Sequence, residues 1–76
     1  MDTRQIRDEL DEYSTDHLNY LIDQYIHSER DRAILRRNLI DKIIFEDLED
    51  EFNLSVRRLK TIVYNGMAKV FRHISD

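Results

Sequence analysis

The chain has 76 residues, a net charge of −4 at pH 7, no cysteine and no proline. Its length allows one domain, and the lack of cysteine excludes a disulfide framework and a thiolate metal site. A single glycine and a charged fraction of 37% favour an all-helical fold, because a β-fold needs more turn residues and alternating runs. No apolar run approaches the roughly 20 residues of a membrane span. The polar start shows no signal peptide, so we expect a cytoplasmic protein without a membrane partner.

The first part of the chain, residues 1–28, is expected to form an N-terminal helical extension. Residues 3–12 form the first predicted helix, with two apolar residues four positions apart. Ser14 is a suitable N-cap for a second helix, which we expect to run to about Ser28. Its apolar stripe consists of Leu18, Leu21, Ile22, Tyr25 and Ile26. Such a stripe indicates a core-facing helix, and a partner-binding face is the alternative.

A third helix is expected to begin after Ser28, with Asp31 in the position of a capping-box acid. Its apolar surface is formed by Ala33, Ile34, Leu35, Leu39 and Ile40. We expect it to break at Asp41 and Lys42, before the next apolar segment.

Residues 46–65 carry the spacing of a helix-turn-helix. Asn53 can adopt the left-handed conformation of a tight turn, and Ser55 can cap the helix that follows. We expect helices over about 45–52 and 56–74. The buried stripe of the second helix consists of Val56, Leu59, Val63, Gly66, Met67, Val70, Phe71 and Ile74. A helix-turn-helix places its second helix in the DNA major groove.

The charge distribution favours the last helix as the nucleic-acid contact. Residues 1–28 carry a net charge of −5 and residues 29–54 a net charge of −3, whereas residues 55–76 carry +4. A basic segment within an acidic chain is the electrostatic pattern of a nucleic-acid interface. The alternative interpretation is that basic residues complement the dipole of a C-terminal helix.

The candidate DNA-binding residues are Ser55, Arg57, Arg58, Lys60, Thr61, Tyr64, Arg36 and Arg37. The two arginines and the threonine at the start of the last helix are expected to face base edges. Lys60 is expected to contact the DNA backbone and Ser55 a phosphate. Tyr64 is the tyrosine near this surface and could stack on a base, and Arg36 and Arg37 could add phosphate contacts from the preceding helix.

From residue 29 to residue 74 the chain resembles the DNA-binding region four of bacterial sigma factors and the small phage or mobile-element proteins built on it. The residues that carry the resemblance are Arg32-Ala33-Ile34-Leu35, Leu39-Ile40-Asp41, Phe45-Glu46-Asp47-Leu48, Phe52-Asn53-Leu54-Ser55-Val56, Leu59-Lys60 and Val63-Tyr64. The resemblance implies a helix-turn-helix domain over residues 29–76 that binds duplex DNA. It also implies RNA polymerase as a second partner.

Four positions depart from the pattern of that family. The family usually has glycine at Lys42, a threonine or serine cap at Ile44, a small residue at Glu49 and often glycine at Asn53. Asn53 is a benign replacement, whereas Lys42 is costly if its backbone needs a positive φ. A carboxylate at a close helix crossing must lean into solvent or find a cation. We therefore expect Glu49→Ala to stabilise the fold.

Catalysis and metal binding are not indicated. His17, His27 and His73 are widely spaced, whereas a metal site needs convergent ligands. Solvent-exposed histidines are the simpler interpretation. The chain has no nucleophile elbow or glycine-rich phosphate loop, so we expect no enzyme, no cofactor and no metal.

These observations predict an all-α domain of four to five helices with a C-terminal helix-turn-helix. The expected function is sequence-directed DNA binding in the regulation of transcription. One alternative is a helical protein-interaction module, such as an anti-regulator, that keeps the fold without binding DNA. Another is a homodimeric bundle built on the helix over residues 18–26. The negative net charge and the acidic helix over 45–52 favour the interaction module.

Overall fold

The fold consists of helices over residues 2–75, the part of the chain that the computed structural model describes. The elements are α1 (Thr3–Leu10), α2 (Thr15–Tyr25), α3 (Glu29–Leu35), a π-helical stretch (Arg36–Ile40) that continues α3, α4 (Phe45–Phe52) and α5 (Val56–Ser75). No strand occurs within these residues, which confirms the all-α expectation. The predicted bounds of α4 are correct, whereas α1 and α2 end earlier than expected.

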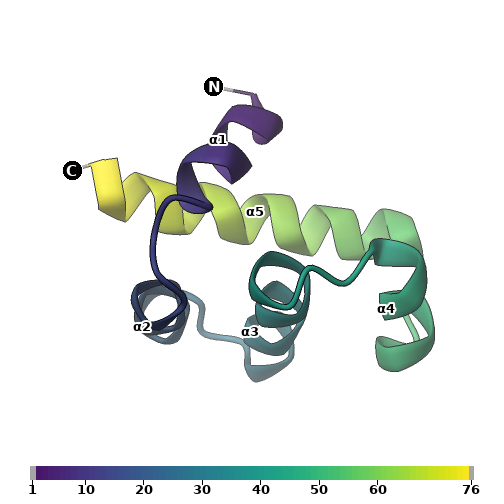
Figure 1. The fold of residues 1–76 in the computed structure, drawn as a ribbon. Helices are drawn as coiled ribbons and strands as arrows, with labels where there is room; N and C mark the ends of the chain where they lie inside the picture. The colour runs from purple at the N-terminus through teal and green to yellow at the C-terminus, as the bar shows by residue number, and fades with distance from the viewer. Residues whose placement is uncertain (1, 76) are drawn as a thin grey trace.

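Helix α5 is the element against which the other helices pack (Figure 1). Helices α2, α3 and α4 lie in a row along it, and α1 crosses it on another side. The buried apolar side chains are Leu10, Leu18, Leu21, Ile22, Ile26, Ile34, Leu35, Leu39, Leu48, Leu59, Ile62, Val63, Met67 and Val70. They form one cluster, so α1 and α2 share a hydrophobic core with the rest of the described chain. None of the helices drawn from residues 2–75 combines the length and the apolar character that a membrane span requires.

Side chains cap the N-termini of four helices, α1, α2, α3 and α5. The three predicted serine caps each accept a hydrogen bond from the backbone N–H three residues on: Ser14 from His17, Ser28 from Asp31 and Ser55 from Arg58. Asp2 caps α1 in a reciprocal arrangement with Gln5, which the sequence reading missed. Helix α2 ends early because Ile26 takes an extended backbone. The Arg32 guanidinium stabilises the segment after α2 by donating hydrogen bonds to the carbonyl oxygens of Ile26 and His27.

The chain changes direction after the π-helical stretch, at the predicted break at Asp41 and Lys42. Lys42 has a φ of 62°, so this position does need a left-handed backbone. The side chain of Asn38 is buried at this bend and forms two hydrogen bonds there. Its amide donates to the carbonyl of Ile43 at 2.9 Å, and its oxygen accepts from Arg7 of α1 at 2.7 Å. Since buried polar groups need partners, this amide fixes the approach to α4.

Candidate nucleic-acid interface

Helices α4 and α5 are joined by the three-residue turn Asn53, Leu54 and Ser55. Asn53 ends α4 in the left-handed conformation, with φ 55° and ψ 44°, as predicted for this residue. Leu54 is half-buried and packs against the core. Leu48 of α4 and Leu59 of α5 are fully buried in that core. The turn is therefore held by apolar contacts on both of its sides.

The side chain of Glu49 makes a second connection between α4 and α5. Its carboxylate accepts a hydrogen bond from the backbone N–H of Val56 at 3.0 Å. This N–H lies in the first turn of α5, where backbone donors have no partner within the helix. An anion at that end also interacts favourably with the helix dipole. Glu49 thus has a backbone donor as its partner, instead of the cation or the solvent expected from the sequence.

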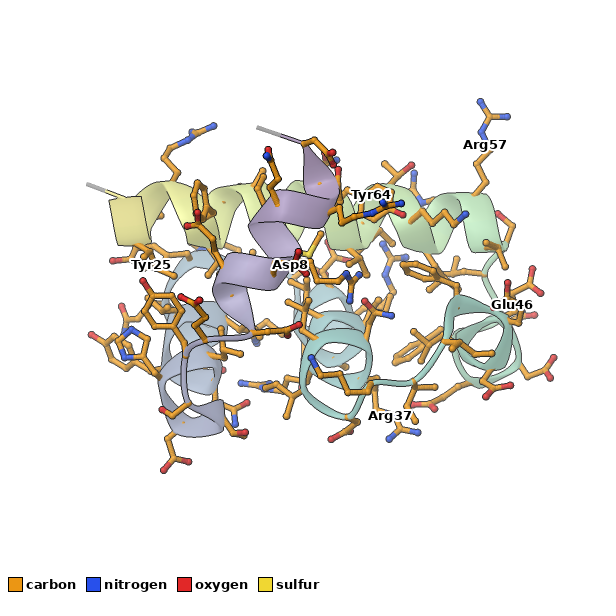
Figure 2. The ribbon with its side chains drawn as sticks, turned by 45° about the horizontal axis from the view of Figure 1, so that its top comes forward. Asp8, Tyr25, Arg37, Glu46, Arg57 and Tyr64 are labelled. Atoms are coloured by element: carbon orange, nitrogen blue, oxygen red, sulfur yellow. The ribbon has the colours of Figure 1, made fainter. Side chains whose placement is uncertain are left out.

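All six candidate residues of the turn and of α5 are exposed: Ser55, Arg57, Arg58, Lys60, Thr61 and Tyr64. Arg57 extends away from the body of the molecule (Figure 2). The Lys60 ammonium lies 5.9 Å from the centre of the Phe45 ring, and Tyr64 meets the same ring edge-on at 6.1 Å. Arg58 lies on another side of α5, in a cleft shared with α3. The candidates therefore occupy different sides of one helix.

The two candidate arginines outside α5 are engaged in ion pairs. Arg36 pairs with Asp23 of α2. Arg37 donates to both carboxylate oxygens of Glu51, at 2.8 Å and 2.9 Å, and pairs with Asp41 at 3.1 Å. The hydrogen bond to Glu51 is the main cause of the raised pKa of Arg37, and it lowers the pKa of the Glu51 carboxyl. Figure 2 places Arg37 on the opposite side of the molecule from α5.

The basic residues after α2 divide into two groups. The five Lys and Arg residues between positions 29 and 54 all form ion pairs with carboxylates: Arg30, Arg32, Arg36, Arg37 and Lys42. By contrast, no carboxylate among residues 2–75 forms an ion pair with the five on α5, which are Arg57, Arg58, Lys60, Lys69 and Arg72. We call these five residues the α5 cations. Their charges are available to an external anion although the net charge of the chain is negative.

Acidic residues of α4 border this basic surface. Glu46 shares a hollow with Arg7, Phe45 and Tyr64. Asp47 is also exposed in the first turn of α4. Carboxylates at this end of a helix are favoured by its dipole. They also limit how far a polyanion can extend over α4.

The sequence reading missed the cleft between α3 and α5. Its lining residues are Ile26, His27, Ser28, Arg30, Asp31, Leu35, Arg58, Thr61, Ile62, Asn65, Gly66 and Lys69. The positions of Thr61, Asn65 and Lys69, four residues apart, place these side chains on one face of a helix. This spacing in the sequence indicates a polar face of the helix. The facing wall comes from residues more than 20 positions earlier, which no local pattern connects to α5.

The histidines do not converge. His17 stacks on Tyr13 with ring centres 5.2 Å apart, and His73 stacks on Tyr25 at 3.6 Å. Among the described side chains, no group of three histidines or acids could hold a metal ion. Comparisons with protein-family models, curated proteins and solved structures find no significant match to this chain.

Proposed function

We propose that the chain binds duplex DNA in a sequence-directed way and thereby regulates transcription. Helices α4 and α5 with their turn would act as a helix-turn-helix, with the first turns of α5 in the major groove. The observation that carries this proposal is that Arg57, Arg58 and Lys60, on the first turns of α5, form no ion pair with a carboxylate of residues 2–75. Lys and Arg residues that meet phosphates release bound counterions, and this release supplies much of the affinity for DNA.

The exposed residues of α5 have distinct roles in this proposal. Arg57 contacts base edges, because it is exposed on the first turn of α5 and Arg pairs bidentately with guanine. Thr61, also expected to read bases, instead lines the cleft with Arg58. Lys60 contacts the backbone from the α4 side, next to Tyr64. Ser55, at the start of the helix, faces a phosphate. The two arginines of the π-helical stretch are left out, because carboxylates already neutralise them.

Fluorescence anisotropy with mixed-sequence duplexes at several salt concentrations tests the proposal. With about three to four phosphate contacts by Lys and Arg residues of α5, log K should fall with log salt at a slope of about −3 to −4. Selection from random duplexes would then identify the preferred site. If no duplex is bound at about 50 mM salt, where electrostatic binding is strong, the DNA proposal is wrong.

A second candidate function is protein binding without DNA. It is favoured by the acidic first turn of α4 and by Ile44, which is 58% exposed beside it. This surface suits a partner with basic and apolar side chains, and the resemblance to sigma region four supports RNA polymerase as one such partner. The two candidates differ in which variants matter: Ile44→Ser should weaken a protein complex but leave DNA affinity unchanged.

A further inference from the structure

The cleft between α3 and α5 has an apolar floor and a basic rim. Ile62 and Leu35 form part of the floor and are buried, whereas Arg58 and Lys69 on the rim are exposed. Arg30 lines the cleft from α3. With three basic residues and one carboxylate, the lining has a net charge of +2 when His27 is neutral. This charge favours an anionic occupant.

Of the polar side chains that line the cleft, those of Arg58, Asn65 and Lys69 have no partner among residues 2–75, whereas Ser28 and Thr61 already form hydrogen bonds. Its single carboxylate, Asp31, already accepts from Arg30 at 3.3 Å. Arg58 and Lys69 have no ion pair with any carboxylate in residues 2–75. The Asn65 amide makes no hydrogen bond to another described side chain or backbone group. Ammonium, guanidinium and amide groups are donors, so this rim offers what a phosphate group requires.

The length of α5 determines where the cleft would lie on a bound duplex. At a rise of 1.5 Å per residue, Lys69 lies about 18 Å along the axis from Arg57. The major groove is only about 12 Å wide. If α5 enters the groove by its first turns with its axis across the groove, the far end of the cleft lies beyond the groove edge, where the sugar–phosphate backbone runs.

From these three observations we infer that the cleft lies along the backbone of the same duplex. Lys69 and Asn65 bind one phosphate, and Arg58, about 16–17 Å away along the helix axis, contacts another. This inference rests on the proposed DNA binding. It changes the role of Arg58, which was expected from the sequence to read a base edge. It also adds Lys69 and Asn65 to the interface.

Two variants with the same change of charge on the same helix test the inference. Lys69→Gln removes a cation from the cleft, and Arg72→Gln removes an exposed cation of α5 that does not line it. DNA affinity is measured for both and for the wild type over a range of salt. We expect Lys69→Gln to flatten the log–log salt slope by about one unit, the value for one lost phosphate contact. Arg72→Gln should keep the wild-type slope, and Lys69→Arg should restore it. Thermal melts confirm that each variant is folded.

The outcomes separate this inference from the proposed function. If the wild type binds DNA and the two Gln variants change the slope equally, the charge acts diffusely and the cleft does not hold a phosphate. If the wild type binds no duplex, the proposed function fails, and the DNA backbone is excluded as the occupant. Addition of pyrophosphate to the DNA-free protein then reports on the cleft itself. Amide chemical-shift changes at Asn65, Gly66 and Lys69 would assign it to a free phosphate ligand, and their absence would overturn the cleft as an anion site.

Discussion

The carboxylate of Glu49 accepts a hydrogen bond from the backbone N–H of Val56, and this bond joins the end of α4 to the start of α5 at 3.0 Å. Ser55 satisfies a second donor of the same turn, the N–H of Arg58. The first turn of α5 is thus capped from two sides. Glu49 reaches across the turn from the preceding helix, so it couples the position of α4 to that of α5.

Because of this bond, Glu49→Ala should destabilise the fold, which reverses the expectation from sequence alone. Loss of a side-chain cap costs about 0.5–2 kcal/mol, whereas alanine gains only a fraction of a kcal/mol in helix propensity. Glu49→Gln keeps an acceptor oxygen and should lose less. Urea denaturation of the three proteins measures the difference. A Glu49→Ala protein as stable as the wild type would mean that the hydrogen bond contributes nothing.

The ion pair between Arg37 and Glu51 should make stability depend on pH in the acidic range. Folding lowers the pKa of Glu51 below its ordinary value of 4.5, so the pair stabilises the fold above that value. The contribution is lost as the pH falls through the lower, folded-state pKa. The midpoint of thermal unfolding should therefore be higher for the wild type than for Glu51→Gln at pH 7, and the difference should disappear as the pH falls below the folded-state pKa of Glu51. Asp50→Asn, a neighbouring exposed acid without an ion pair to a described residue, is the control.

Gly66→Ala should destabilise the contact between α3 and α5. A Cβ at Gly66 would lie 2.5 Å from Cδ1 and 3.0 Å from Cδ2 of Leu35. Leu35 is fully buried, so its side chain or helix α3 must shift to accommodate the added methyl group. Alanine gains about 1 kcal/mol in helix propensity, and overpacking typically costs about 1–3 kcal/mol. We expect a net loss on the order of 1 kcal/mol in urea denaturation.

The shorter side chain of Leu35→Val tests the cause of that loss. It should reduce the cost of Gly66→Ala, because the two side chains share one space. Strictly additive effects in the double variant would show that the two residues do not compete for it.

Arg57 and Arg58 are adjacent, but their alanine variants should behave differently in DNA binding. Arg57→Ala should relax the preference at one base position and cost about 1–3 kcal/mol there. Arg58→Ala should weaken all duplexes alike, as Lys60→Ala should, because Arg58 faces the cleft. Affinities for the selected site and for single-base variants of it measure both effects. Equal loss on every duplex for all three variants would indicate purely electrostatic binding without base reading.

The helices could be predicted because their signals are local. Ser14, Ser28 and Ser55 cap the helices that follow them, and Asn53 adopts the left-handed turn that its side chain tolerates. Each of these features depends on residues within about four positions, which the spacing of the sequence displays.

The partners of the charged side chains could not be predicted in the same way. Arg37 binds Glu51, which lies 14 positions later in the sequence. Arg30 and Lys69 line the cleft from opposite walls. Both depend on how α3 packs against its neighbours, which periodicity does not specify. For the same reason the sequence predicted that Arg37 contacts a DNA phosphate, whereas in the structure Arg37 already forms an ion pair with Glu51. The role of Glu49 was hidden because its partner is a backbone group.

Helix α5 contributes Leu59, Ile62, Val63, Met67 and Val70 to the core and also carries the α5 cations. One rigid backbone therefore serves both folding and the basic surface. Folding alone orders that backbone, so a partner of α5 would meet a preorganised surface. Its association would restrict mainly the ends of the exposed side chains, which is the smaller part of the entropy cost of binding.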